Sequence, residues 1–208
     1  MIEAYNPILL IAIVIGVMFA LHLLNIRRTI LNKRRLVADV ISMASQPRDL
    51  LDHAWTEKDY TGLDTKLSDW ERQIREIARR HAKTPSLHEF TGIGSSTNQP
   101  LSVAIAIIDD TLSVLLRIVP PEERSAQSVL LSLRGAINSL TKTLSGAGIA
   151  PARVVPALPE LPKRLETLFR SAEHEMTGEF LVRRSLLFAW VKHDNASWYD
   201  AQPEHPIG

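Results

Sequence analysis

The chain has 208 residues, 45% of them hydrophobic and 23% charged, which excludes a disordered tail protein and fits one modest domain with an accessory segment. Its 24 Lys and Arg residues nearly balance 23 Asp and Glu residues, which excludes a globally basic nucleic-acid binder on bulk charge. Because Cys is absent, disulfides, thiolate zinc sites, Cys-bound iron–sulfur clusters and a Cys nucleophile are excluded as well.

The first predicted element is a membrane-spanning helix over residues 7–26, which follows a short N-terminus of residues 1–6. No charged side chain occurs between Glu3 and Arg27, and a helix of this length is about 30 Å long, the thickness of the hydrocarbon core of a bilayer. A signal peptide would carry positive charge before its apolar run and a cleavage site after it, whereas here the charge order is reversed and no convincing site follows. We therefore expect an uncleaved anchor.

A basic belt follows the apolar run, within a juxtamembrane helix predicted over residues 27–46. The belt contains no acidic residue and consists of Arg27, Arg28, Lys33, Arg34 and Arg35. By the positive-inside rule, this asymmetry predicts an external N-terminus and a cytoplasmic body, as in a bacterial inner-membrane protein. The belt would lie against anionic lipid, although a topology signal alone is the simpler interpretation and the one we favour.

Small residues at a spacing of four, Ala12, Gly16 and Ala20, mark one face of the predicted membrane helix. Such a face lets a second helix approach closely, so it is a candidate surface for self-association or for a partner helix. Small residues are also common in membrane helices without this role.

Residues 47–144 are predicted to form a helical bundle. Its clearest helix carries apolar and aromatic residues at alternating steps of three and four, which places them on one seam. The seam consists of Tyr60, Leu63, Leu67, Trp70, Ile74 and Ile77. Three heptads do not separate a coiled coil from a bundle helix, so the seam is either a partner surface or a part of the bundle core.

Two further apolar segments, residues 101–119 and 126–144, are separated by a Pro-Pro pair and predict an antiparallel helical hairpin. The first segment is long enough to suggest a second membrane span. Asp109 and Asp110 lie at its middle, however, and two carboxylates would be costly in lipid. We therefore place it at the centre of the bundle.

The two carboxylates are candidates for an acid–base pair, but adjacent helix positions diverge by about 100° and would not share one pocket unaided. We instead expect Asp109 and Asp110 on a polar strip that faces water, or in a salt bridge to Arg117 or Arg134. The short clusters Arg79-Arg80-His81 and Arg183-Arg184 are interpreted as solvated faces.

Residues 145–162 contain four Pro and two Gly and predict a linker. A C-terminal amphipathic helix is predicted over residues 163–193, and an irregular tail over residues 194–208. The apolar run near the end of that helix is too short to span a bilayer. It could pack on the bundle, form a short strand, or anchor to the membrane or a partner.

The sequence carries few of the motifs that indicate catalysis. It has no phosphate loop, dinucleotide glycine motif, serine elbow or HExxH motif. A His-Glu pair recurs at His88 and His174 and suggests a metal site, but the flanking sequences do not align and chance similarity explains the recurrence better. We therefore predict no catalytic, cofactor-binding or metal-binding residues, and no nucleic-acid partner.

These observations predict an all-α protein with a single N-terminal transmembrane helix followed by a cytoplasmic helical bundle. The expected function is that of a structural or adaptor subunit of a membrane-associated assembly, with membrane lipid and other protein subunits, or itself, as partners. The seam and residues 180–191 would provide partner surfaces. The alternatives are a signalling or effector protein that self-associates through its membrane helix, a membrane-anchored enzyme, and an oligomeric pore.

Overall fold

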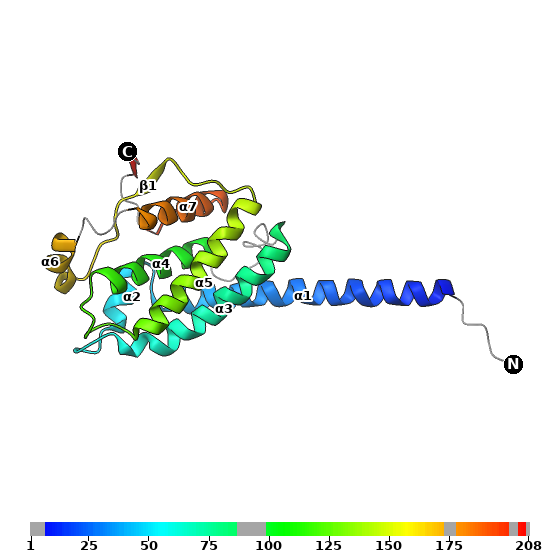
Figure 1. Cartoon of the computed structure of the whole chain (residues 1–208), viewed down its shortest axis with the longest axis horizontal. Helices are drawn as coiled ribbons and strands as arrows, with labels where there is room; N and C mark the ends of the chain where they lie inside the picture. Colours follow the sequence, from blue (N-terminus) through cyan, green and yellow to red (C-terminus); the bar gives the residue numbers. More distant parts are fainter. Residues whose placement is uncertain (1–6, 87–98, 173–177, 200–203, 207–208) are drawn as a thin grey trace.

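The computed structural model describes residues 7–86, 99–172, 178–199 and 204–206 of the chain. This part of the chain is all-α apart from two short strands, as the sequence predicted (Figure 1). The α-helices are α1 (Pro7–Met43), α2 (Pro47–Ala54), α3 (Asp64–Lys83), α4 (Leu101–Arg117), α5 (Gln127–Gly146), α6 (Lys163–Ala172) and α7 (Glu179–His193). A 3₁₀ turn, η1 (Thr61–Leu63), precedes α3, and the strands are β1 (Val154–Pro156) and β2 (Glu204–Pro206).

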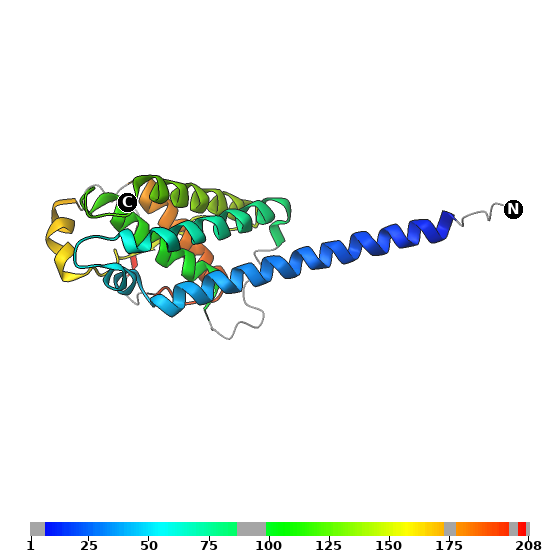
Figure 2. The same ribbon diagram turned by 90° about the horizontal axis from the view of Figure 1, so that it is seen from below.

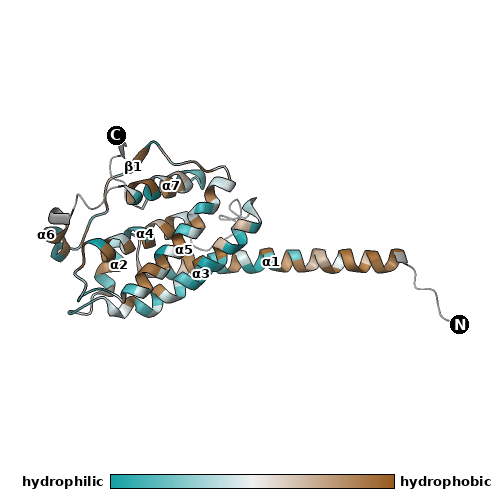
Figure 3. Cartoon of the chain, in the orientation of Figure 1, coloured by the Kyte–Doolittle hydropathy of each residue, from teal (hydrophilic) through white to brown (hydrophobic). Residues whose placement is uncertain are grey.

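Helix α1 is one continuous helix whose two halves have different surroundings. Its N-terminal half projects beyond the bundle, and its C-terminal half lies along the bundle (Figure 2). The projecting half is apolar on all sides, with Ile8 to Leu24 exposed, and hydropathy changes where α1 meets α3 (Figure 3). Leu36 and Val40 of the other half are fully buried. The predicted membrane and juxtamembrane segments therefore meet at residue 26 without a break in the helix.

Helix α4 forms the centre of the bundle. Every residue from Leu101 to Leu115 is buried, because the helix is mostly apolar and is covered by α1, α2, α5 and α7. Helices α4 and α5 form the predicted antiparallel hairpin, and α3 packs along α5 in the same direction. The expectation that α4 presents a polar strip to water was wrong.

The C-terminal region differs from the prediction in two ways. The amphipathic helix predicted over residues 163–193 is two helices, since α6 ends at Ala172 and α7 begins at Glu179. Gly178 precedes α7 with a φ of +60°, a conformation that residues with a side chain rarely adopt. In addition, β1 from the predicted linker pairs antiparallel with β2 from the predicted irregular tail, with Val155 opposite His205.

The apolar run near the end of α7 packs on the bundle, which is the first of the three alternatives considered for it. Phe180, Leu187, Phe188, Trp190 and Val191 are all buried. Residues 180–191 are therefore mainly a part of the core, and the expectation that this segment offers an open partner surface was wrong for these side chains.

Candidate functional site at the junction of the membrane helix and the bundle

Arg80 of α3 fastens the bundle to α1 at the end of the apolar run. Its guanidinium donates hydrogen bonds to the Asn25 carbonyl at 2.8 Å, to Asn25 Oδ1 at 2.7 Å and to Thr29 Oγ1 at 3.0 Å. Thr29 is buried, and the Arg80 side chain is only 15% exposed. Hydrogen bonds from an ionised donor are stronger than neutral ones, so this contact fixes the end of α3 beside the end of the predicted span. We call this contact the Arg80 clamp.

Glu76 supports the Arg80 clamp from within α3. It accepts hydrogen bonds from Arg80 Nε at 2.6 Å and from the Arg79 guanidinium at 2.7 Å. Partial burial alone would raise the pKa of Glu76, but the hydrogen bonds from Arg80 and Arg79 lower it below its ordinary value. The carboxylate is therefore ionised at neutral pH and holds Arg80 in the orientation that reaches α1.

A second contact joins α1 to α3 farther from the apolar half of α1. Asp39 of α1 accepts hydrogen bonds from Lys66 Nζ at 2.5 Å and from the Trp70 indole at 2.6 Å. Asn25 and Asp39 are separated by about 20 Å along α1 at 1.5 Å per residue. Two polar contacts at this separation, with buried apolar residues between them, hold α1 and α3 at one fixed angle.

The basic belt is divided by the helical periodicity of α1. Arg27, Arg28 and Arg35 are exposed and Arg34 is half-buried. Lys33 is buried and faces the bundle, where the charge of Asp194 acts on it. It lies on the same side of α1 as buried residues one turn away in each direction, so the expectation that Lys33 lies against lipid was wrong.

The predicted seam lies in the bundle core. All six of its side chains are at most 2% exposed: Tyr60, Leu63, Leu67, Trp70, Ile74 and Ile77. The interpretation of the seam as a part of the bundle is therefore confirmed, and its interpretation as a partner surface was wrong. The Tyr60 hydroxyl also accepts a hydrogen bond from Arg164 of α6, which ties that outlying helix to the core.

The small-residue face of α1 is exposed along the projecting half. Ala12, Gly16 and Ala20 have no covering element, and a Cβ at Gly16 would meet no atom within 4 Å. A role for this face in helix association stays a prediction.

A buried ionic cluster joins α4 to α5 and α7. Asp109 accepts hydrogen bonds from Arg134 of α5 and from Arg183 Nε of α7, the latter at 2.8 and 3.0 Å. Asp110 pairs with Arg184 at 3.0 Å and accepts a hydrogen bond from the Tyr199 hydroxyl. The two carboxylates thus point to different partners, as adjacent positions on a helix must.

The ionic cluster corrects one prediction and confirms part of another. The salt bridge from Asp109 to Arg134 is present, but neither Asp109 nor Asp110 is solvated, since they are 0% and 1% exposed. Arg183 and Arg184 were expected on a solvated face, and both are largely buried. The matching of an adjacent acidic pair with an adjacent basic pair on another helix is the sequence signal that could have indicated this cluster.

The electrostatics of the ionic cluster indicate a structural role. Burial raises the pKa of Asp110 even though the charge of Arg184 opposes the shift. Burial and the nearby Asp110 raise the pKa of Tyr199 well above its ordinary value. Arg184 also donates to the Pro156 carbonyl at 3.2 Å, so the cluster extends to β1. Every charge has a partner from another element, which fixes how α4, α5, α7 and β1 pack together.

Among the residues that the structure describes, no group of three or more His, Cys, Asp or Glu residues is arranged to hold a metal ion. His88 and His174, the two His-Glu pairs considered as metal ligands, lie outside the described residues.

The fold and the junction together define a class of protein, a helical bundle continuous with one helix that is long and apolar enough to cross a membrane. The chain is similar to a particular protein of Bacillus subtilis (strain 168), "Uncharacterized membrane protein YdjJ". The two are 22% identical over 182 residues, which is 85% of this chain and 52% of the relative, so the chain spans about half the length of that relative. No family model matches the chain, and no solved structure matches it. The similarity and the apolar helix support a membrane protein with a helical fold and one candidate transmembrane helix.

Proposed function

We propose that this protein is a single-pass, membrane-anchored structural or adaptor subunit that holds its bundle at the membrane surface for other proteins of an assembly. The observation that carries the proposal is the continuity of α1, whose exposed apolar half would span the bilayer and whose other half is packed in the bundle. The basic belt supports an external N-terminus and a cytoplasmic bundle. The proposed role is non-catalytic.

A rigid connection suits a subunit that positions other proteins. A flexible anchor would need a linker rich in Gly and Ser between the span and the body. Here the Arg80 clamp and the Asp39 contact instead fix the bundle relative to the membrane helix. The orientation of α1 in the bilayer would therefore determine which face of the bundle a neighbouring subunit meets.

Two exposed apolar side chains on the bundle are the best candidates for partner contacts. Leu131 of α5 is 53% exposed and Val182 of α7 is 63% exposed. Since exposed apolar side chains are favoured at protein contacts over water, these are the two positions to test for a partner.

The test is photo-crosslinking in the native membrane with an unnatural amino acid at Leu131 or at Val182, and at the exposed Thr65 as the matched control. Mild-detergent extraction and mass spectrometry then identify what each position captures. We expect one stoichiometric foreign subunit from Leu131 or Val182 and none from Thr65. The proposal fails if all three positions capture only the protein itself or nothing.

The exposed small-residue face favours one alternative, a protein that self-associates through its membrane helix. Gly16→Leu tests it, because the substitution would separate two helices in contact there without touching the bundle. Under the adaptor proposal, the extracted complex keeps its subunits and its mass. Loss of a homo-oligomer in this variant would favour the alternative. Protease added to intact spheroplasts tests topology separately, since it should spare a cytoplasmic bundle.

A further inference from the structure

Charged side chains are distributed unevenly along α3. From Asp64 to Glu76 the helix carries four acidic and three basic residues, whereas Ile77–Lys83 carries three cations, Arg79, Arg80 and Lys83, and no acidic residue. Cations are favoured at the C-terminal end of any helix by its dipole. The helix dipole explains why cations gather at the C-terminal end of α3. It does not explain why this end of α3 lies beside the predicted span.

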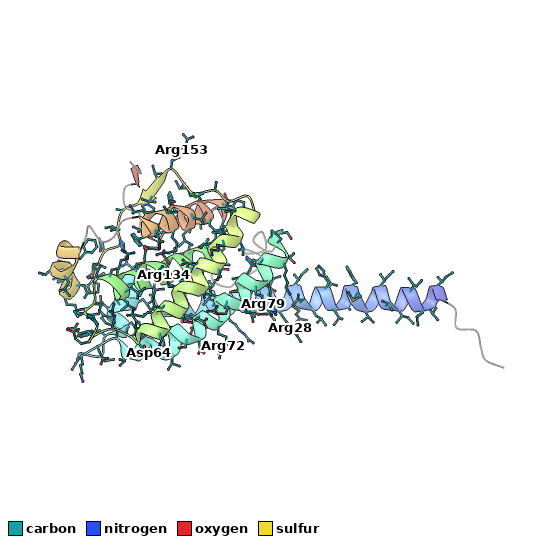
Figure 4. The ribbon with its side chains drawn as sticks, viewed as in Figure 1. Arg28, Asp64, Arg72, Arg79, Arg134 and Arg153 are labelled. Atoms are coloured by element: carbon teal, nitrogen blue, oxygen red, sulfur yellow. The ribbon has the colours of Figure 1, made fainter. Side chains whose placement is uncertain are left out.

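The Arg80 clamp gives these cations their position. Because Arg80 bonds to Asn25, the end of α3 is level with the last residues of the apolar run. Arg79 and Lys83 flank Arg80 and are exposed, Arg79 to 63% of its side chain. Figure 4 shows Arg79 beside the part of α1 that carries Arg28.

The exposed cations at this level are Arg27 and Arg28 of α1 and Arg79 and Lys83 of α3. Together with Arg80 and Glu76, which form the clamp, we call them the junction face. It has five cations and one carboxylate, and Glu76 is occupied by Arg79 and Arg80. Its cations come from two helices that pack against each other, so the face is broader than a single stripe along α1.

We propose that the junction face binds the headgroups of anionic phospholipids in the leaflet on the side of the bundle, with α3 supplying half of the binding surface. A lipid surface is the occupant that the geometry favours, because the face begins where the apolar part of α1 ends. Each Lys or Arg near an anionic leaflet strengthens binding about fivefold at low ionic strength. The inference rests on the membrane anchorage in the proposed function and does not depend on partner subunits.

The experiment uses the purified full chain in phosphatidylcholine nanodiscs doped with phosphatidylglycerol. Since the chain has no Cys, Ala82→Cys gives one attachment site for a donor fluorophore on the exposed end of α3. Energy transfer is measured to acyl-chain-labelled phosphatidylglycerol and, separately, to acyl-chain-labelled phosphatidylcholine at the same mole fraction. The ratio of the two reports anionic-lipid enrichment beside α3.

Two double variants test the face at equal change of net charge. Arg79→Gln with Lys83→Gln removes two cations from the junction face, and Arg72→Gln with Arg153→Gln removes two exposed cations elsewhere, as Figure 4 shows. We expect enrichment in the unaltered protein, loss at about fivefold per cation in the first variant, and little change in the second. High salt should lower the enrichment of the unaltered protein, because exposed charges are screened.

Equal transfer to the two lipids in the unaltered protein would overturn the proposal, and so would the same loss in both double variants. Unchanged tryptophan fluorescence in all proteins shows that the bundle is folded. A failure to find partner subunits would count against the proposed function and would leave this lipid measurement unaffected.

Discussion

The ionic cluster gives a prediction whose size can be worked from the structure. Arg184→Met removes the only guanidinium that forms a salt bridge with Asp110 in the described part of the chain. Asp110, which is 1% exposed, then keeps the hydrogen bond from the Tyr199 hydroxyl but has lost its ion pair. Removing one partner of a buried ion pair costs about 3–5 kcal/mol. For a body of this size, each 1 kcal/mol lowers the melting temperature by about 2–4 °C, so we expect a decrease of about 10 °C.

Asp110 can escape part of this cost by taking up a proton, which makes the prediction pH-dependent. Burial already raises its pKa in the unaltered protein, and loss of Arg184 should raise it further. A raised carboxyl pKa means that the folded state binds the proton more tightly, so the stability of Arg184→Met falls as pH rises from the ordinary pKa through the raised one. The difference from the unaltered protein should be larger at neutral than at mildly acidic pH.

The assay is urea unfolding in detergent, followed by tryptophan fluorescence. All four Trp residues lie outside residues 7–26, and Trp70 and Trp190 are fully buried, so the signal reports the bundle and not the membrane helix. Circular dichroism would instead report the helical signal of the bundle and of the membrane helix together.

A triple variant, Asp110→Leu with Arg184→Met and Tyr199→Phe, distinguishes two causes of instability in Arg184→Met. One is the unpaired buried charge on Asp110, and the other is the loss of the contacts that Arg184 makes. It removes the charges together and should unfold within about 2 kcal/mol of the unaltered protein, because buried pairs replaced by apolar residues are often neutral. Arg183→Met is the matched control, since Asp109 keeps Arg134 and the loss should be about 1–2 kcal/mol. The reasoning is refuted if the triple variant is as unstable as Arg184→Met.

Three further predictions concern single positions. Ile74→Ala should lower the free energy of unfolding by about 2–5 kcal/mol because the side chain is fully buried, and urea titration would show a loss below 1 kcal/mol if it were not in the core. Gly178→Val should cost about 1–3 kcal/mol, because φ +60° with ψ −118° is a conformation that residues with a side chain rarely adopt and a Cβ there meets no atom within 4 Å. Thermal unfolding checks this, and an unchanged melting temperature would contradict it. Arg80→Gln should broaden the distance distribution between spin labels on α1 and α3, measured by pulsed electron resonance, whereas Arg79→Gln should leave it narrow.

The elements that the sequence predicted well are those with long periodic patterns. The apolar run of α1 and the seam of α3 each extend over several helical turns, so one misplaced residue does not change the interpretation. The hairpin of α4 and α5 was indicated by a Pro-Pro break between two apolar segments. Each of these signals depends on residues that are close together in the chain, so it can be recognised in a single sequence.

The features that were missed depend on contacts between distant residues. Asp109 and Asp110 were expected to face water because a charge is usually solvated, and their burial is possible only because α5 and α7 bring Arg134, Arg183 and Arg184 to them. The strands β1 and β2 are three residues each, too short to show alternation, and pair across about fifty residues of chain.

The fold groups the cations at the junction differently from the sequence. In sequence, the five cations of the belt form one group, and Arg79-Arg80 is a separate cluster on another helix. In the fold, helical periodicity turns Lys33 inward, while the Arg80 clamp brings the end of α3 to the end of the span. A topology signal needs only charge near the apolar run, and the exposed Arg residues of α1 meet that need alone. The cations of α3 lie far from the span in sequence and still reach it in space, so their position requires the fold and is the part of the surface that a topology signal does not explain.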